Sequence, residues 1–268
     1  MYKFTPQFLK MGQRLITVIQ PILKAAGDEI LKIYNSDKAN VVDHKTDDSP
    51  LTLADIAANK VIILGLEDAF DYPIISEENE SIPFSERKEF TKFWCVDPLD
   101  GTKEFINRNG EFTVNIALID NGIPVFGGIY VPVTDTYYFG IKDEGAFKQK
   151  GSGVLEVLKV NKNSGDWIAV GSKSHAKPAE KEFYQEIGVK ESFSVGSSLK
   201  FCMVAEGSAD LYYRSGPTME WDIAAGHAIV TAAGGEVYKD LDCTEVFTYN
   251  KVDLLNGAFL ATSTKELK

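Results

Sequence analysis

Residues that form disulfides or bind zinc are scarce in this chain. Its 268 residues include three histidines and three cysteines, and Cys95, Cys202 and Cys243 are far apart and form no Cys-x-x-Cys pair. This pattern suggests neither a disulfide framework nor a zinc site built from cysteine or histidine. We expect reduced cysteines and a cytoplasmic location, with peripheral attachment to the inner face of a membrane as the alternative.

Long apolar runs and an excess of basic residues are also missing. No window approaches the roughly 20 apolar residues of a membrane span, and residues 1–10 contain no basic segment followed by an unbroken apolar stretch. The 28 basic and 39 acidic residues give a formal net charge of -11, which disfavours a nucleic-acid polymer or an anionic membrane as partner. We expect a small-molecule substrate and no transmembrane segment, and the sequence leaves the oligomeric state open.

Two frequent catalytic motifs are absent as well. The chain has no Gly-Lys-Ser/Thr phosphate loop and no Gly-x-Ser-x-Gly nucleophile turn. What it has is the apolar patterning of an ordinary globular protein, with 44% hydrophobic and 25% charged residues.

The first part of the chain has the apolar spacing of helices. This spacing predicts one helix over residues 8–34, which Pro21 would kink or split, and a second from an N-cap at Thr52 to about Ala69. A short strand is expected at residues 72–76.

From Phe93 onward the apolar pattern has a period of two, which is typical of strands. We predict antiparallel strands at residues 93–96, 112–119, 127–130, 136–139 and 145–148. After a join rich in glycine, serine and asparagine, strands alternate with helices: strands at 168–171, 192–195, 209–213 and 236–238, and helices near 178–187, 199–206 and 223–233. The chain therefore divides near residue 155 into an N-terminal α+β subdomain (1–155) and a C-terminal α/β subdomain (156–268), with the site between them.

The most informative segment is residues 94–102, where two carboxylates follow an apolar strand. Pro98 is expected to stop the strand ladder, and Gly101 allows the backbone to turn, so that Asp97 and Asp100 end up close together. The carbonyl of Leu99 lies between the two acids. Hard oxygen donors of this kind suit Mg²⁺, although a surface turn with an aspartate cap explains the pair equally well.

Three other acids bear on that choice. Glu77 follows the predicted strand 72–76, Asp222 stands directly before a helix of small residues, and Asp55 lies one turn into the second helix. Taken singly, they are explained by a solvated loop, a helix N-cap and an exposed helix acid. Taken together with the turn at residues 97–102, they favour a cation site to which both halves of the chain contribute.

The order of these motifs resembles the inositol monophosphatase superfamily of metal-dependent, lithium-sensitive phosphatases. The resemblance rests on the Asp-Pro-Leu-Asp-Gly-Thr and Trp-Asp-Ile-Ala-Ala-Gly segments, residues 97–102 and 221–226, and it extends from residues 48–52 to Gly234 and Gly235. It implies the layered helix–sheet sandwich of the inositol monophosphatase and sugar phosphatase type. Four further segments are similar to the 3'(2'),5'-bisphosphate nucleotidase, or CysQ-type, branch: residues 93–105, 109–112, 196–202 and 209–214.

The resemblance implies a set of metal ligands. Glu77, Asp97 and the Leu99 carbonyl would hold one Mg²⁺, and Asp97, Asp100 and Asp222 a second. A third, loosely held Mg²⁺ near Glu77 is a further possibility. Two such ions can clamp the attacking and leaving oxygens of an in-line phosphoryl transfer.

The resemblance also implies catalytic roles. Thr102, hydrogen-bonded to Asp55, would accept the proton of the attacking water or fix its direction, because a hydroxyl alone is too weak a base. Glu77 would help to orient that water. The amides of Gly101 and Thr102, together with Asp222, would contact the substrate.

A second phosphate and a nucleoside require contacts of their own. The resemblance assigns these contacts to three residues: Ser197, Lys200 and Arg214. From the residues alone, Lys200 and Arg214 could equally be ordinary surface cations. One departure from the family pattern is Ser172, which stands where some members have histidine, and His175 or Lys173 would substitute for it.

The resemblance implies a Mg²⁺-dependent phosphatase of sulfur metabolism that hydrolyses the 3'-phosphate of adenosine 3',5'-bisphosphate. Two alternatives stay open. One is an inositol or sugar monophosphatase with the same metal site. The other is a noncatalytic nucleotide-binding module, which would not need the Asp55 and Thr102 pair.

Overall fold

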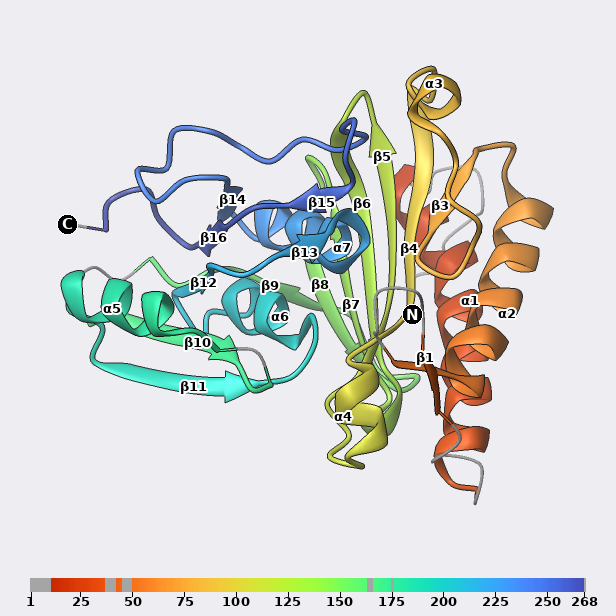
Figure 1. The fold of residues 1–268 in the computed structure, drawn as a ribbon, viewed down its shortest axis with the longest axis horizontal. Coiled ribbons are helices and arrows are strands. Elements are labelled where there is room, and N and C mark those ends of the chain that lie inside the picture. Colours follow the sequence, from red (N-terminus) through yellow and green to blue (C-terminus); the bar gives the residue numbers. More distant parts are fainter. Residues whose placement is uncertain (1–10, 37–41, 45–49, 163–165, 175, 268) are drawn as a thin grey trace, which may run out of the picture.

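The computed structural model describes residues 11–36, 42–44, 50–162, 166–174 and 176–267, and these form five layers in which helices and sheets alternate (Figure 1). Two helices cover one face of a seven-stranded sheet. Two further helices lie between that sheet and a five-stranded sheet, and one helix covers the outer face of the second sheet. This is the layered sandwich that the family resemblance implies.

The outer helical layer consists of α1 (Met11–Tyr34) and α2 (Leu53–Ala69). Buried residues of α1 such as Ile19 and Leu23 pack against α2 and the sheet. α1 continues through Pro21 as a single helix, so Pro21 does not split it, and a kink there stays a prediction. The N-cap of α2 is confirmed, because the hydroxyl of Thr52 accepts a hydrogen bond from the Ala54 amide at 3.2 Å.

The first sheet has the strand order β3-β4-β5-β6-β7-β8-β9, and only its β3–β4 pair is parallel. The strands are β3 (Ile74–Ser76), β4 (Lys92–Asp100), β5 (Thr113–Asp120), β6 (Ile123–Val131), β7 (Thr136–Ile141), β8 (Gly145–Lys150) and β9 (Glu156–Leu158). The sequence pattern missed β9, because three residues are too few to show a period.

Between the sheets lie α6 (Leu199–Ala205) and α7 (Glu220–Ala232). α7 approaches the first sheet closely because two strand positions facing it have no side chain. A Cβ at Gly127 would lie 2.3 Å from the Ala225 carbonyl oxygen, and one at Gly140 would lie 2.4 Å from the Ile229 Cα. The backbones of α7 and the sheet are therefore in direct contact.

The second sheet has the order β11-β10-β12-β16-β14, and α5 (Pro178–Glu186) covers its outer face (Figure 1). Its strands are β10 (Ile168–Ser172), β11 (Glu191–Val195), β12 (Leu211–Arg214), β14 (Glu236–Tyr238) and β16 (Phe259–Thr262). The sequence pattern missed β16. The shorter elements are β1 (Val42–His44), β2 (Pro50–Thr52), α3 (Phe84–Arg87), α4 (Thr102–Ile106), η3 (Pro132–Thr134), β13 (Thr218–Met219) and β15 (Leu255–Asn256).

Along the chain, β9 is the last strand of the first sheet, and the next strand, β10, belongs to the second sheet. One continuous apolar core joins the two, since buried residues of β4, β5 and β6 pack with those of α6, α7 and β12. The division into two subdomains near residue 155 stays a prediction. None of the helices described combines the length and apolar character needed to cross a bilayer.

Candidate metal and phosphate site

Three carboxylates from separate elements meet at the edge of the first sheet. Oxygen atoms of Glu77, Asp97 and Asp222 all lie within 4.8 Å of one another. The parallel β3–β4 ladder pairs Ser76 with Val96, so the residues that follow, Glu77 and Asp97, lie side by side. α7 brings Asp222 to the same place from the other half of the chain.

The sequence predicted that the strand ladder would stop at Pro98, but β4 continues to Asp100. Its register against β5 shifts between Asp97 and Asp100, and pairing resumes where Asp100 meets Thr113. Within this bulge the Leu99 amide donates to an Asp97 oxygen at 3.0 Å. A β-bulge redirects side chains, and here Asp97, Leu99 and Asp100 all line one cavity.

Asp222 lies inside the first turn of α7, whereas the sequence placed it directly before the helix. α7 begins at Glu220, and the Met219 amide donates to the Asp222 Oδ2 at 2.7 Å, as in a capping box. One carboxylate oxygen thus fixes the helix start. The simple N-cap explanation accounts for the hydrogen bond to the Met219 amide but not for the place of Asp222 in the carboxylate cluster.

The clustered acids are electrostatically unfavourable without a cation. Burial raises the pKa of Asp97 well above its ordinary value, and repulsion by Glu77, Asp100 and Asp222 adds to this. Burial and repulsion by Asp100 and Glu77 raise the pKa of Asp222 in the same way. Burial raises the pKa of Asp100 to about 6, although Lys200 opposes that shift. An all-oxygen set of mutually repelling donors fits a hard divalent cation such as Mg²⁺.

Asp55 and Thr102, which the resemblance paired, are in contact. The Thr102 hydroxyl lies 3.3 Å from the Asp55 Oδ1 and 3.4 Å from the Leu99 carbonyl oxygen. The other Asp55 oxygen accepts the amide and the hydroxyl of Thr52, at 2.7 and 2.5 Å. Asp55 is 2% exposed, so it is not the exposed helix acid of the simpler explanation, and the capping box holds its orientation.

The cluster opens into a cavity of about 780 Å³ that residues from both halves of the chain line. Those named from the sequence are Glu77, Asp97, Leu99, Asp100, Gly101, Thr102, Ser172, Ser197, Lys200, Arg214 and Asp222. Sequence reasoning missed Lys177 and Thr218, which also line it and which belong to no motif. Lys173 pairs instead with Glu111 at 2.9 Å, and His175 lies outside the described residues.

Lys200 and Arg214 are 5% and 8% exposed, which rules out the surface-cation explanation. The Lys200 ammonium donates to the carbonyl oxygens of Val195 and Ser197, at 3.2 and 2.5 Å. Burial lowers the pKa of Lys200 to about 8, although Asp100 and Glu104 oppose that shift. With three protons and two such partners, the ammonium keeps a donor for a ligand in the cavity.

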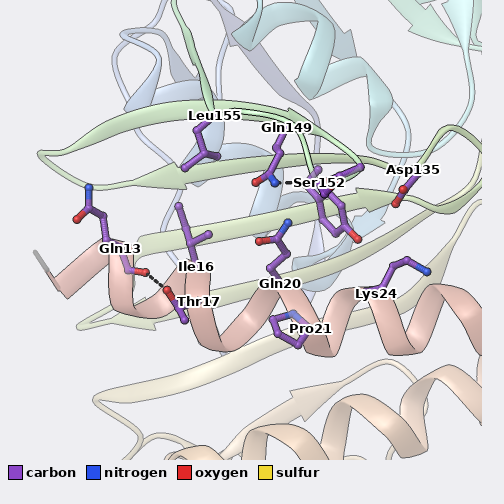
Figure 2. Close-up of a pocket in the computed structure, with 12 residues that line it drawn as sticks. Gln13, Ile16, Thr17, Gln20, Pro21, Lys24, Asp135, Gln149, Ser152 and Leu155 are labelled. Atoms are coloured by element: carbon purple, nitrogen blue, oxygen red, sulfur yellow. Dashed lines mark hydrogen bonds between the residues drawn. The ribbon is translucent and has the colours of Figure 1, made fainter. Parts of the chain in front are cut away.

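A second cavity, of about 860 Å³, lies between α1 and strands β7 and β8 (Figure 2). Its lining includes the amides of Gln13, Gln20 and Gln149, and Asp135 is the one carboxylate among the described residues that line it. It therefore lacks the clustered acids that a divalent cation requires.

Known proteins resemble this chain over most of its length. A model of the inositol monophosphatase family matches residues 11–268. The 3'(2'),5'-bisphosphate nucleotidase CysQ of Shigella flexneri is 47% identical over 228 residues, covering 83% of this chain and 91% of that protein. The protein of the same name from Buchnera aphidicola is 43% identical over 253 residues, covering 94% of each.

Solved structures show the same likeness. CysQ from Bacteroides thetaiotaomicron, described as a bacterial member of the inositol monophosphatase family, is 40% identical with a TM-score of 0.83 and covers 95% of this chain and 98% of its own. An inositol monophosphatase from Anabaena is 24% identical with a TM-score of 0.71, covers 95% of this chain and 92% of its own, and shows a likeness of fold alone.

Proposed function

The chain belongs to the inositol monophosphatase family, and on that premise we propose that it is a metal-dependent 3'(2'),5'-bisphosphate nucleotidase. Its reaction is the hydrolysis of the 3'-phosphate of adenosine 3',5'-bisphosphate to AMP and phosphate. The observation that carries this proposal is one cavity that holds both a carboxylate cluster and, in its wall, two buried cations, Lys200 and Arg214. The CysQ relatives bear the same activity in their name.

The residues that would hold Mg²⁺ are those of the cluster and the β4 bulge: Glu77, Asp97, Asp100, Asp222 and the carbonyl of Leu99. Two or three ions per site are proposed. When bound, such ions supply positive charge that activates water and offsets charge on the phosphoryl oxygens.

Thr102 and Asp55 would handle the proton of the attacking water. With its own proton directed to the Asp55 carboxylate, the Thr102 hydroxyl offers a lone pair to the water at its Oγ1. As the water proton moves to Oγ1, the threonine proton can pass to Asp55, so the pair acts as one base. Glu77 would help to direct the water.

The phosphoryl oxygens would be held by the start of α4. The backbone turns at Gly101, whose φ is +91°, so that the amides of Gly101 and Thr102 can face the cavity that both residues line. Backbone amides that are fixed in place before reaction stabilise charge that develops on oxygen. Asp222 would contact the substrate beside them.

Two observations favour a nucleotide with two phosphates over the alternatives. An inositol or sugar monophosphate has one phosphate, which the cluster can bind, and gives no reason to bury Lys200 and Arg214 in the wall of the same cavity. A noncatalytic binding module would have no use for Thr102 directed at Asp55. Ser197, Lys200 and Arg214 are therefore proposed as contacts of the second phosphate and the nucleoside.

The experiment is a steady-state comparison of adenosine 3',5'-bisphosphate with inositol 1-phosphate, in Mg²⁺ and in a chelator. We expect Mg²⁺-dependent phosphate release and a kcat/KM for the bisphosphate at least about 100-fold above that for inositol 1-phosphate. A higher kcat/KM for inositol 1-phosphate would establish the monophosphatase alternative. Binding of the bisphosphate without turnover would establish the binding module. A cytoplasmic location, expected from the free cysteines, belongs to the same proposal.

A further inference from the structure

The segment between α4 and β5 contacts the second half of the chain through one side chain, Glu111. Its Oε2 accepts the Gly196 amide at 2.8 Å, and its Oε1 accepts the Lys173 ammonium at 2.9 Å. Gly196 and Lys173 follow the neighbouring parallel strands β11 and β10. One carboxylate thus ties together the ends of two strands of the second sheet and anchors both to the first half.

The contact around Gly196 is tight. A Cβ there would lie 2.5 Å from the Glu104 Cγ and 2.7 Å from the Glu111 carbonyl oxygen. Glu104, which is 5% exposed, adds a second bridge, because the Ser174 hydroxyl donates to its Oε1 at 2.5 Å. Residues 104–111 therefore supply two connections between the halves on this side of the cavity.

Gly196 leads directly into the turn that carries the proposed phosphate contacts. Ser197 has a φ of +46°, a left-handed conformation that a non-glycine residue keeps only when its surroundings hold it. Its carbonyl oxygen accepts the Lys200 ammonium at 2.5 Å. The next residue, Ser198, is fixed by hydrogen bonds of 2.8 Å to Thr113 and to Asn115 on β5. The position of Ser197 and Lys200 thus depends on contacts with the first half.

We propose that Glu111 is a positioning residue that sets the affinity for the second phosphate of the substrate. It does not line the cavity and acts through the Gly196 amide and the turn at residues 196–198. The inference rests on the proposed function, because it assumes that Ser197 and Lys200 contact a bisphosphorylated nucleotide. It gives a physical role to Glu111, which lies in the segment 109–112 whose sequence resembles the nucleotidase branch.

Loss of this bridge should affect the side of the cavity around Ser197 and Lys200 most, although Asp100 also contacts the turn by accepting a backbone hydrogen bond from Ser198. The Glu77–Asp97 neighbourhood is held by the β3–β4 ladder, and Asp222 by the start of α7. None of the hydrogen bonds described for these three acids involves Glu111. Weaker binding of the second phosphate with unchanged chemistry at the first is therefore the signature of a positioning role.

The test compares Glu111→Ala, Glu111→Gln and Lys173→Ala on adenosine 3',5'-bisphosphate and on p-nitrophenyl phosphate, a simple monophosphate ester. For Glu111→Ala we expect a rise in KM for the bisphosphate of about tenfold or more, and kcat and the KM for the simple ester within about threefold of wild type. Glu111→Gln keeps an acceptor for the Gly196 amide and loses the ion pair, so its KM should rise about threefold. Lys173→Ala also loses the ion pair and should show the same rise in KM as Glu111→Gln.

Glu206→Ala is a matched control, because Glu206 pairs with Lys148 at 2.6 Å and its side chain is 23% exposed, against 25% for Glu111. It should leave both KM values within about twofold of wild type. An equal rise in KM for both substrates in Glu111→Ala, or no rise, would overturn the positioning role. A wild-type enzyme that shows no preference for the bisphosphate would instead overturn the proposed function. If Glu111→Ala fails to fold, Glu111→Gln and Lys173→Ala decide the question.

Discussion

The two ends of the cavity satisfy their buried charges in opposite ways. At the metal end, Asp97 and Asp222 face other carboxylates, and their pKa values rise well above the ordinary range. At the substrate end, the Lys200 ammonium donates to the carbonyl oxygens of Val195 and Ser197 and keeps a third proton for a ligand. The buried cation is thus partly paired within the protein, whereas the clustered carboxylates repel one another and depend on a cation from outside it.

The largest effect is expected at the carboxylate that all the others repel. Asp97→Asn should lower Mg²⁺-dependent phosphate release by about 10³-fold or more, because a shared anionic donor is lost. The same change should raise the melting temperature measured in chelator, because it removes like-charge repulsion. Parallel activity and melting assays check both outcomes, with Asp222→Asn as the companion variant. Full activity in either variant would contradict the metal scheme.

A smaller loss is expected at Thr102, beside the same end. Thr102→Val keeps the shape and removes the hydroxyl that contacts Asp55, so kcat should fall about 10²-fold with KM nearly unchanged. Thr102→Ser restores the hydroxyl and should recover activity to within about fivefold of wild type. Equal activity of the valine and serine variants would show that the hydroxyl takes no part in the reaction.

At the substrate end the effect should be on binding. Lys200→Met and Arg214→Met should each raise the KM for adenosine 3',5'-bisphosphate about 30-fold, and that for p-nitrophenyl phosphate less than about threefold. Lys190→Met is the control, because Lys190 is an exposed lysine paired with Asp166. Parallel rises for both substrates would count against these residues as contacts of a second phosphate.

The smallest effect concerns stability and pH in the absence of metal. An unfolded aspartate ionises near pH 3.8, whereas folded Asp100 keeps its proton to about pH 6. The folded state therefore binds more protons between these values, and the free energy of unfolding should fall as pH rises through that window, by about 2 kcal/mol for this partly exposed group. Asp97 and Asp222, whose pKa values are also raised, should extend the fall to higher pH.

Urea unfolding in chelator across about pH 4 to 8 measures this fall. Saturating Mg²⁺ should flatten the curve, and Asp97→Asn should reduce its slope. A metal-free protein whose stability is constant over this range would show that the acids do not repel one another in the fold.

The sequence predicted the metal end better than the substrate end. Asp97, Leu99 and Asp100 are close together because they are neighbours in the chain, and the β3–β4 pairing that adds Glu77 follows from two nearby apolar runs. The bulge at Pro98 was not foreseen, because the ladder resumes at Asp100 only through pairing with Thr113. The actual start of α7 was missed as well, since the residues before Asp222 give no clear cap signal.

The substrate end is built from contacts that link residues far apart in sequence. Glu111 to Gly196 and Glu104 to Ser174 connect the two halves, and no periodicity or spacing encodes such a pair. The one available signal was that Glu111 directly precedes a buried strand in the segment typical of the nucleotidase branch. The sequence pattern missed the short strands β9 and β16 for a related reason, because their place in the sheets depends on their partner strands.

The two glycines of the first sheet that contact α7 determine how the carboxylate cluster tolerates substitutions elsewhere in the core. Because Gly127 and Gly140 meet the helix backbone directly, the thickness of two backbones sets the separation between the sheet that carries Asp97 and the helix that carries Asp222. Side chains elsewhere in the core can vary in size over time without altering the spacing of these two carboxylates. The same contact leaves no room for adjustment, so a single methyl group at Gly140 would move the Asp222 carboxylate from a position more than 80 residues away in the chain.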